Sequence, residues 1–77
     1  MEITNVKITS NVIQLDQLLK WLGIIDTGGQ IKFFLDSYRI FLNGVLVTEK
    51  RKKIYVGDII KIENIGAWKV INNDENK

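Results

Sequence analysis

The dipeptide Asn43-Gly44 stands between two short runs of β-branched and apolar residues, 40–42 and 45–47. Asn-Gly is the strongest short signal for a two-residue hairpin, because both residues accept the positive φ angles that this turn requires. The sequence therefore predicts two antiparallel strands joined by a tight turn, and the rest of the fold must be compatible with a sheet at the middle of the chain.

Four further segments have the short length and β-branched composition that are typical of strands. They are segments 3–8, 54–56, 59–62 and 68–71. The first mixes apolar and polar residues as an edge strand does, and Gly57-Asp58 predicts a turn between the second and the third. These segments predict a small, mostly antiparallel sheet.

Two segments carry apolar residues at helical spacing. The first stripe repeats at i, i+3, i+4 and i+7 over residues 15–22, and the following Gly23 predicts the end of that helix. Asn11 and Gln14 form a candidate capping pair upstream. The second stripe has the same spacing over residues 31–38, so a second helix follows the first directly.

The predicted strands and the two predicted helices together indicate an α+β fold in which two short helices pack on a small, mostly antiparallel sheet. The helices are expected to share one core, which consists of Leu15, Leu18, Leu19, Ile31, Phe34 and Leu35. Tyr38, on the second stripe, is expected to be buried with them. We expect a single domain over residues 1–72 and a disordered polar tail over residues 73–77, where no apolar residue occurs.

The residues that the chain lacks exclude most catalytic and metal chemistry. Its 77 residues include no Cys and no His, so disulfides, zinc knuckles, thiol nucleophiles and the commonest general base are absent. A domain of this size also has no room for a deep substrate cavity. We therefore expect no enzyme, no metal site and no cofactor.

Hydropathy gives no reason to expect a membrane protein. No apolar run approaches the roughly 20 residues that cross a bilayer, and residues 1–10 have neither the basic start nor the apolar centre of a signal peptide. A cytoplasmic monomer without a membrane partner is expected.

Several motifs occur in the order seen in one family of RNA-binding domains. They are Leu15-Asp16-Gln17-Leu18-Leu19, the helix 28–35, Leu42-Asn43-Gly44 and Gly57-Asp58-Ile59-Ile60. In this order they resemble the ribosomal-protein-S-four-like RNA-binding domain, also called the alpha-L RNA-binding motif. Stretches 27–32 and 50–58 are similar to the small stand-alone YaaA-type branch, and the resemblance covers residues 13–71. It implies binding of structured RNA and a role on the ribosome or in its assembly.

Some positions depart from the family pattern. The family often has Arg before the Leu-Asp pair and after the helix-capping Ser, where this chain has Gln14 and Gly28. The YaaA-type branch usually begins its basic segment with Arg, where this chain has Glu49. The resemblance therefore implies fewer of the family's RNA contacts here.

The segment Thr27-Gly28-Gly29 precedes the second helix and is a candidate phosphate site. The N–H groups and the dipole at a helix start suit an anion, Thr27 can cap the helix, and the glycines leave room for a ligand. Lys32 would lie beside the site, one turn into the helix. The alternative is that the glycines only make a tight turn between the helices.

Four consecutive cations, Lys50, Arg51, Lys52 and Lys53, form a basic stretch. If extended, they point alternately to both faces and can straddle a phosphate backbone. Lys20 and Arg39, near the ends of the predicted helices, could complete a basic patch with this stretch. Arg39 is the better candidate, because its planar guanidinium group can bind a phosphate through two N–H groups. The alternatives are a solvated loop and charges that only solubilise the protein.

These features predict a non-catalytic protein that binds structured RNA, with ribosomal RNA as the expected target, through backbone phosphates. One alternative is a β-grasp, ubiquitin-like module, which shares the Asn-Gly and Gly-Asp turns; carrier chemistry is not expected, because no Gly-Gly ends the chain. Another is a protein-binding adaptor that uses Trp21, a residue off the first stripe that either is exposed or packs under the amino-terminal strand.

Overall fold

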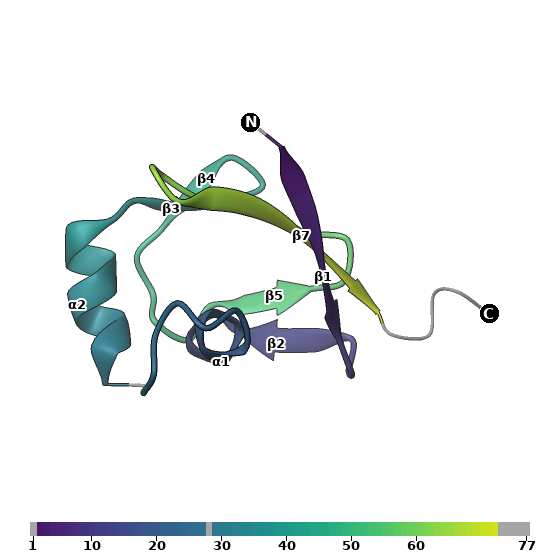
Figure 1. The fold of residues 1–77 in the computed structure, drawn as a ribbon, viewed down its shortest axis with the longest axis horizontal. Helices are drawn as coiled ribbons and strands as arrows, with labels where there is room; N and C mark the ends of the chain where they lie inside the picture. Colours follow the sequence, from purple (N-terminus) through teal and green to yellow (C-terminus); the bar gives the residue numbers. More distant parts are fainter. Residues whose placement is uncertain (1, 28, 73–77) are drawn as a thin grey trace.

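The computed structural model describes residues 2–27 and 29–72 and has the predicted α+β architecture (Figure 1). In chain order the elements are β1 (Ile3–Ile8), β2 (Val12–Gln14), α1 (Leu15–Trp21), α2 (Gln30–Ser37), β3 (Ile40–Leu42), β4 (Val45–Val47), β5 (Lys53–Tyr55), β6 (Ile59–Ile62) and β7 (Gly66–Asn72). The predicted fold class is confirmed. The predicted tail, 73–77, lies outside the described residues, and the domain limit at residue 72 stays a prediction.

Five strands form one sheet in the order β1-β7-β6-β3-β4. The pairs of β7 with β6, β6 with β3 and β3 with β4 are antiparallel, whereas β1 runs parallel to β7 at the sheet edge. The predicted edge strand Ile3–Ile8 is therefore confirmed, and its partner comes from the far end of the described chain.

A separate two-stranded sheet is formed by β2 and β5, in which Ile13 pairs with Ile54. The sequence did not predict β2, because its three residues are too few to show an alternating pattern. This short sheet brings the segment just before α1 next to the end of the basic stretch, where Gln14 pairs with Lys53.

Both predicted turns are present. Asn43 and Gly44 have φ angles of 51° and 87°, the two positive values of the hairpin turn that Asn-Gly favours. Gly57 has a φ angle of 99°, a backbone conformation in which any residue with a side chain would be strained. The two turns frame the central part of the sheet as predicted.

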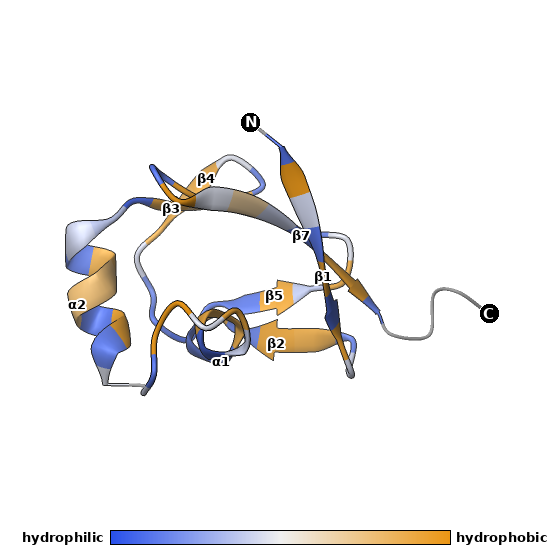
Figure 2. Cartoon of the chain, viewed as in Figure 1, coloured by the Kyte–Doolittle hydropathy of each residue, from blue (hydrophilic) through white to orange (hydrophobic). Residues whose placement is uncertain are grey.

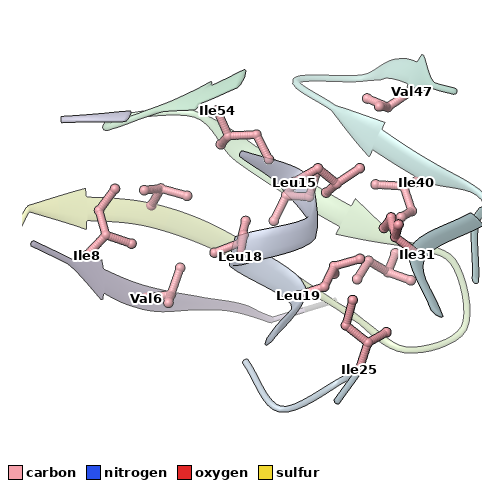
Figure 3. Packing of buried hydrophobic residues seen from close by; sticks show 13 residues of the cluster. Val6, Ile8, Leu15, Leu18, Leu19, Ile25, Ile31, Ile40, Val47 and Ile54 are labelled. Atoms are coloured by element: carbon pink, nitrogen blue, oxygen red, sulfur yellow. The ribbon is translucent and has the colours of Figure 1, made fainter. Parts of the chain in front are cut away.

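The core lies between α1 and one face of the five-stranded sheet. Leu15, Leu18 and Leu19 of α1 each have 0% exposure. Figure 3 shows them between the side chains of β1 on one side and those of Ile31 and Ile40 on the other. The buried cluster consists of Val6, Ile8, Leu15, Leu18, Leu19, Ile25, Ile31, Ile40, Val47, Ile54, Ile60, Ile62 and Val70.

Helix α1 ends where the sequence predicts and begins without the predicted cap. Gly23 has a φ angle of 75°, and its N–H donates to the Lys20 carbonyl at 3.0 Å. The residue before the helix is Gln14, and its side chain makes no capping bond. The candidate capping pair of Asn11 and Gln14 is therefore wrong, because residues 12–14 form β2 and the helix begins only at Leu15.

Helix α2 packs less deeply than its apolar stripe predicts. Ile31 is buried, but Phe34 and Leu35 are only partly buried against the core. Tyr38 is 40% exposed, so the prediction that it belongs to the core is wrong. The helix ends at Ser37 and Tyr38 is extended, with φ −131° and ψ 144°. The Tyr38 ring packs against that of Phe34, with 4.7 Å between the centroids, at the exposed end of the stripe.

Candidate nucleic-acid interface

The basic stretch, residues 50–53, connects β4 to β5 and lies against the start of α1. The Leu15 N–H donates to the Lys52 carbonyl at 2.8 Å, and the Asp16 N–H donates to the Lys50 carbonyl at 3.2 Å. All four basic side chains are exposed. The backbone of the stretch is thus held by the helix start while its charges face solvent.

Of the four basic residues, only Lys53 lies in a strand, at the start of β5. Lys50 and Arg51 are in a turn, and the Lys52 N–H donates to the Glu49 carbonyl at 3.3 Å. The prediction that the stretch interrupts the sheet is confirmed. Its cations are therefore presented by a loop, and not by a continuous strand.

The start of α1 is not itself an anion site, because the first N–H groups of the helix are already bonded. The carbonyls of the basic stretch take the first two, and the Gln17 N–H donates to Oδ1 of Asp16 at 2.9 Å. Asp16 is only 8% exposed and puts negative charge at the positive end of the helix dipole. A phosphate here would have to be bound by the basic side chains.

The surface beside the basic stretch is concave. One hollow of about 380 Å³ is lined by Glu49, Arg51, Lys52, Lys53 and Tyr55. A second hollow shares two of these residues, Glu49 and Lys52, and continues along β3 and β4. In the view of Figure 1 the segment between β4 and β5 passes between α2 and α1, and Figure 2 shows it as a hydrophilic trace.

The predicted cap of α2 is wrong. The residue before the helix is Gly29, and no side-chain capping bond is made at this start. Instead, Oε1 of Gln30 accepts hydrogen bonds from the N–H groups of Asp26 and Thr27, at 2.5 Å and 3.2 Å. The Gln30 side chain thus reaches back to the loop, and the Gln30 N–H donates to the Thr27 carbonyl at 3.2 Å.

The proposed phosphate site at the start of α2 is only partly described. Thr27, Gly29 and Lys32 are exposed, whereas Gly28 lies outside the described residues. Gly29 has helical angles, φ −69° and ψ −20°, and an added Cβ would meet only the Thr27 hydroxyl oxygen at 3.9 Å. Space and backbone conformation therefore do not require glycine at position 29.

Of the two isolated candidates, Lys20 lies on α1 and Arg39 lies between α2 and β3. Lys20 is exposed in the last turn of α1, the helix whose start holds the stretch. Arg39 is exposed just before β3, and its carbonyl accepts the Glu63 N–H at 2.9 Å. Since Ile40 pairs with Val47, Arg39 lies at the end of the hairpin from which the chain enters the stretch.

An exposed aromatic side chain, that of Tyr55, lies beside the basic stretch and was missed by sequence reasoning. Tyr55, 52% exposed, lines the hollow beside the basic stretch. The alternation of Lys53, Ile54 and Tyr55 was the available signal, because a buried isoleucine places both neighbours on the outer face. Trp21 is 54% exposed, so it does not pack under the amino-terminal strand.

Within residues 2–27 and 29–72, no group of three or more acidic residues is placed to hold a metal ion. The described helices are too short and too polar for any of them to cross a membrane.

Comparison with known proteins assigns this fold to a family. A family model described as "S4 domain" matches residues 6–71. The chain belongs to the S4 domain family, which confirms the resemblance seen in its motifs and indicates an RNA-binding module. A similar protein is the "Probable ribosome maturation protein RlbA" of Bacillus subtilis (strain 168). The two are 34% identical over 67 residues, which cover 87% of this chain and 94% of the relative.

Proposed function

We propose that this protein binds structured RNA, with ribosomal RNA as the target, and acts in ribosome assembly in the cytoplasm without catalysing a reaction. Family membership and a relative named for ribosome maturation support this proposal. The observation that carries it is the basic stretch, whose backbone is bonded to the start of α1 while its four side chains are exposed.

The proposed mechanism is recognition of the phosphate backbone. A loop with a fixed backbone presents its charges at defined positions, so less entropy is lost when they meet phosphates. Lys20 and Arg39 extend the basic surface along α1 and past the β3–β4 hairpin. Contacts of this kind set position and orientation on an RNA helix and carry little sequence information.

The start of α2, with Thr27, Gly28, Gly29 and Lys32, is proposed as a second phosphate contact. The Asp26 and Thr27 N–H groups already bond to Gln30, so a ligand there would use groups further into the helix and the Lys32 side chain.

The β-grasp alternative is disfavoured by the second helix and by the family match. An adaptor that uses Trp21 remains the second candidate, because this side chain is 54% exposed.

A charge-reversal experiment with a matched control tests the proposal. The test variant combines Arg51→Glu, Lys52→Glu and Lys53→Glu, and the control combines Lys7→Glu, Lys61→Glu and Lys69→Glu. Both change the net charge equally, and all six side chains are exposed. The control lysines project from the sheet face opposite the core, because Val6, Ile60 and Val70, which precede or follow them, are buried.

We expect the test variant to lose at least about tenfold in affinity for several RNA hairpins of unrelated sequence, and the control to lose much less. Equal losses would show attraction to net charge alone and would contradict the proposed surface. In cells, crosslinking should recover ribosomal RNA with the protein; recovery of protein partners alone would favour the adaptor.

A further inference from the structure

Tyr55 is presented to solvent by a strand whose other face is in the core. Ile54 has 0% exposure, so Lys53 and Tyr55 lie together on the outer face of β5. Tyr55 pairs with Val12 across the two-stranded sheet, and the rings of exposed tyrosines offer a broad apolar surface. The side chain is 52% exposed, which leaves much of this surface accessible.

The backbone of Tyr55 is held on both sides. Its N–H donates to Oδ2 of Asp58 at 2.8 Å, and its carbonyl accepts the Asp58 N–H at 3.0 Å. Asp58 is bonded in turn to the Asn43 side chain at 3.0 Å. A ligand that contacts the ring therefore meets a strand that is already ordered, which lowers the entropy lost on binding.

The ring and the cations share one hollow. Arg51, Lys52 and Lys53 line it together with Tyr55, and Glu49 is its single carboxylate. The hollow is a surface depression that is open to solvent, so a base can approach Tyr55 from outside. An aromatic ring beside several cations is the combination that binds a nucleotide, because the base stacks on the ring while the phosphate meets the charges.

We propose that this hollow holds one unpaired nucleotide of the RNA, with its base stacked on Tyr55 and its phosphate bound by the basic stretch. The proposal rests on the proposed function and adds a preference for RNA with a bulged or looped nucleotide near the helix that the cations contact. A base inside a duplex is stacked on its neighbours and cannot reach the ring, whereas an unpaired base can turn outward.

Two RNA probes that differ by a single nucleotide test this proposal. One is a fully paired duplex, and the other carries one unpaired nucleotide in the middle of the same helix. The variants are Tyr55→Ala, Tyr55→Leu and Tyr55→Phe, each compared with the wild type and with the variant that reverses the charges of Arg51, Lys52 and Lys53.

We expect the wild type to prefer the probe with the unpaired nucleotide by about tenfold, in line with the strength of one base–aromatic stack. Tyr55→Ala and Tyr55→Leu should remove this preference and leave duplex binding unchanged, whereas Tyr55→Phe should keep it. Leucine restores apolar area but offers no ring face, so it separates stacking from general hydrophobic contact.

Other results would overturn the proposal. Equal weakening on both probes in Tyr55→Ala would assign Tyr55 a structural role, and unchanged preference would exclude stacking at this ring. If the wild type binds the duplex and the charge-reversed variant does not, the proposed function stands even when the stacking fails. If the wild type binds neither probe better than the charge-reversed variant, the proposed function itself fails.

Discussion

Asp58 joins the two turns that frame the sheet. Its Oδ1 accepts from the Asn43 side-chain amide at 3.0 Å, and its Oδ2 accepts from the Tyr55 N–H at 2.8 Å. The Asn43 side chain also accepts the Ile59 N–H at 2.9 Å. The residues of the Asn-Gly and Gly-Asp motifs are therefore bonded to each other as well as within their own turns.

Replacing Asp58 by Ala should lower the free energy of unfolding by about 1–3 kcal/mol, because two donors lose their partner. Urea unfolding followed by circular dichroism measures the change. Asp36→Ala, at an exposed position of α2, is the control and should change stability little. Equal unfolding midpoints for the two variants would show that the bonds of Asp58 add no stability.

Leu19 carries the strongest stability prediction, because its side chain is fully buried at the centre of the core. Leu19→Ala should lower the free energy of unfolding by about 2–5 kcal/mol, through lost burial and the cavity that remains. This is a large share of the stability of so small a domain. Phe33→Ala, at a side chain that is 76% exposed, serves as the control in the same thermal unfolding measurement. A melting temperature unchanged by Leu19→Ala would contradict the assignment.

Helix α1 and the basic stretch depend on each other. A helix of seven residues is too short to be stable alone, and its first N–H groups are satisfied by the Lys50 and Lys52 carbonyls. In return, these bonds order the loop that carries the cations. The RNA-binding surface proposed here is therefore coupled to the packing of α1 in the core.

The start of α2 makes a separate prediction through two substitutions of Gly29. Gly29→Ala fits the helical backbone, since the added Cβ has only one neighbour, at 3.9 Å. It should leave the unfolding midpoint unchanged or raise it slightly. Gly29→Asp adds negative charge beside Lys32 and should weaken RNA binding several-fold more than Gly29→Ala does. Similar losses of stability in both variants, with no difference in binding, would indicate a purely structural turn.

Charge is distributed over the whole molecule, whose net charge is only +2. The proposed surface carries its cations on the basic stretch, Lys20, Lys32 and Arg39, whereas Lys7, Lys61 and Lys69 project from the sheet face opposite the core. Attraction to RNA therefore depends on where the cations are placed, because their excess over the carboxylates is small.

The salt dependence of binding measures how many phosphates this placement engages. Contacts with roughly four to six phosphates should give a slope of about −3 to −5 in a plot of log affinity against log salt concentration. Fluorescence anisotropy with a labelled RNA hairpin over a range of potassium chloride concentrations provides the measurement. A slope near zero would contradict backbone binding.

Local patterns in the sequence were sufficient for the main elements. The Asn43-Gly44 hairpin, the Gly57-Asp58 turn and the Leu15, Leu18 and Leu19 stripe all appear as predicted. Each depends on the conformational preference of one or two residues or on spacing within two turns of helix, so each is encoded over a short distance. The cations of the candidate site were equally visible as a run of consecutive residues.

Long-range contacts account for what the sequence alone could not predict. Strand β2 exists because it pairs with β5, some 40 residues later in the chain. The basic stretch is ordered by a helix start that precedes it by a similar distance. Such features depend on which segments meet in the folded chain. That choice is decided by the burial and hydrogen bonding of many residues together, so it cannot be predicted from the pattern of any one short segment.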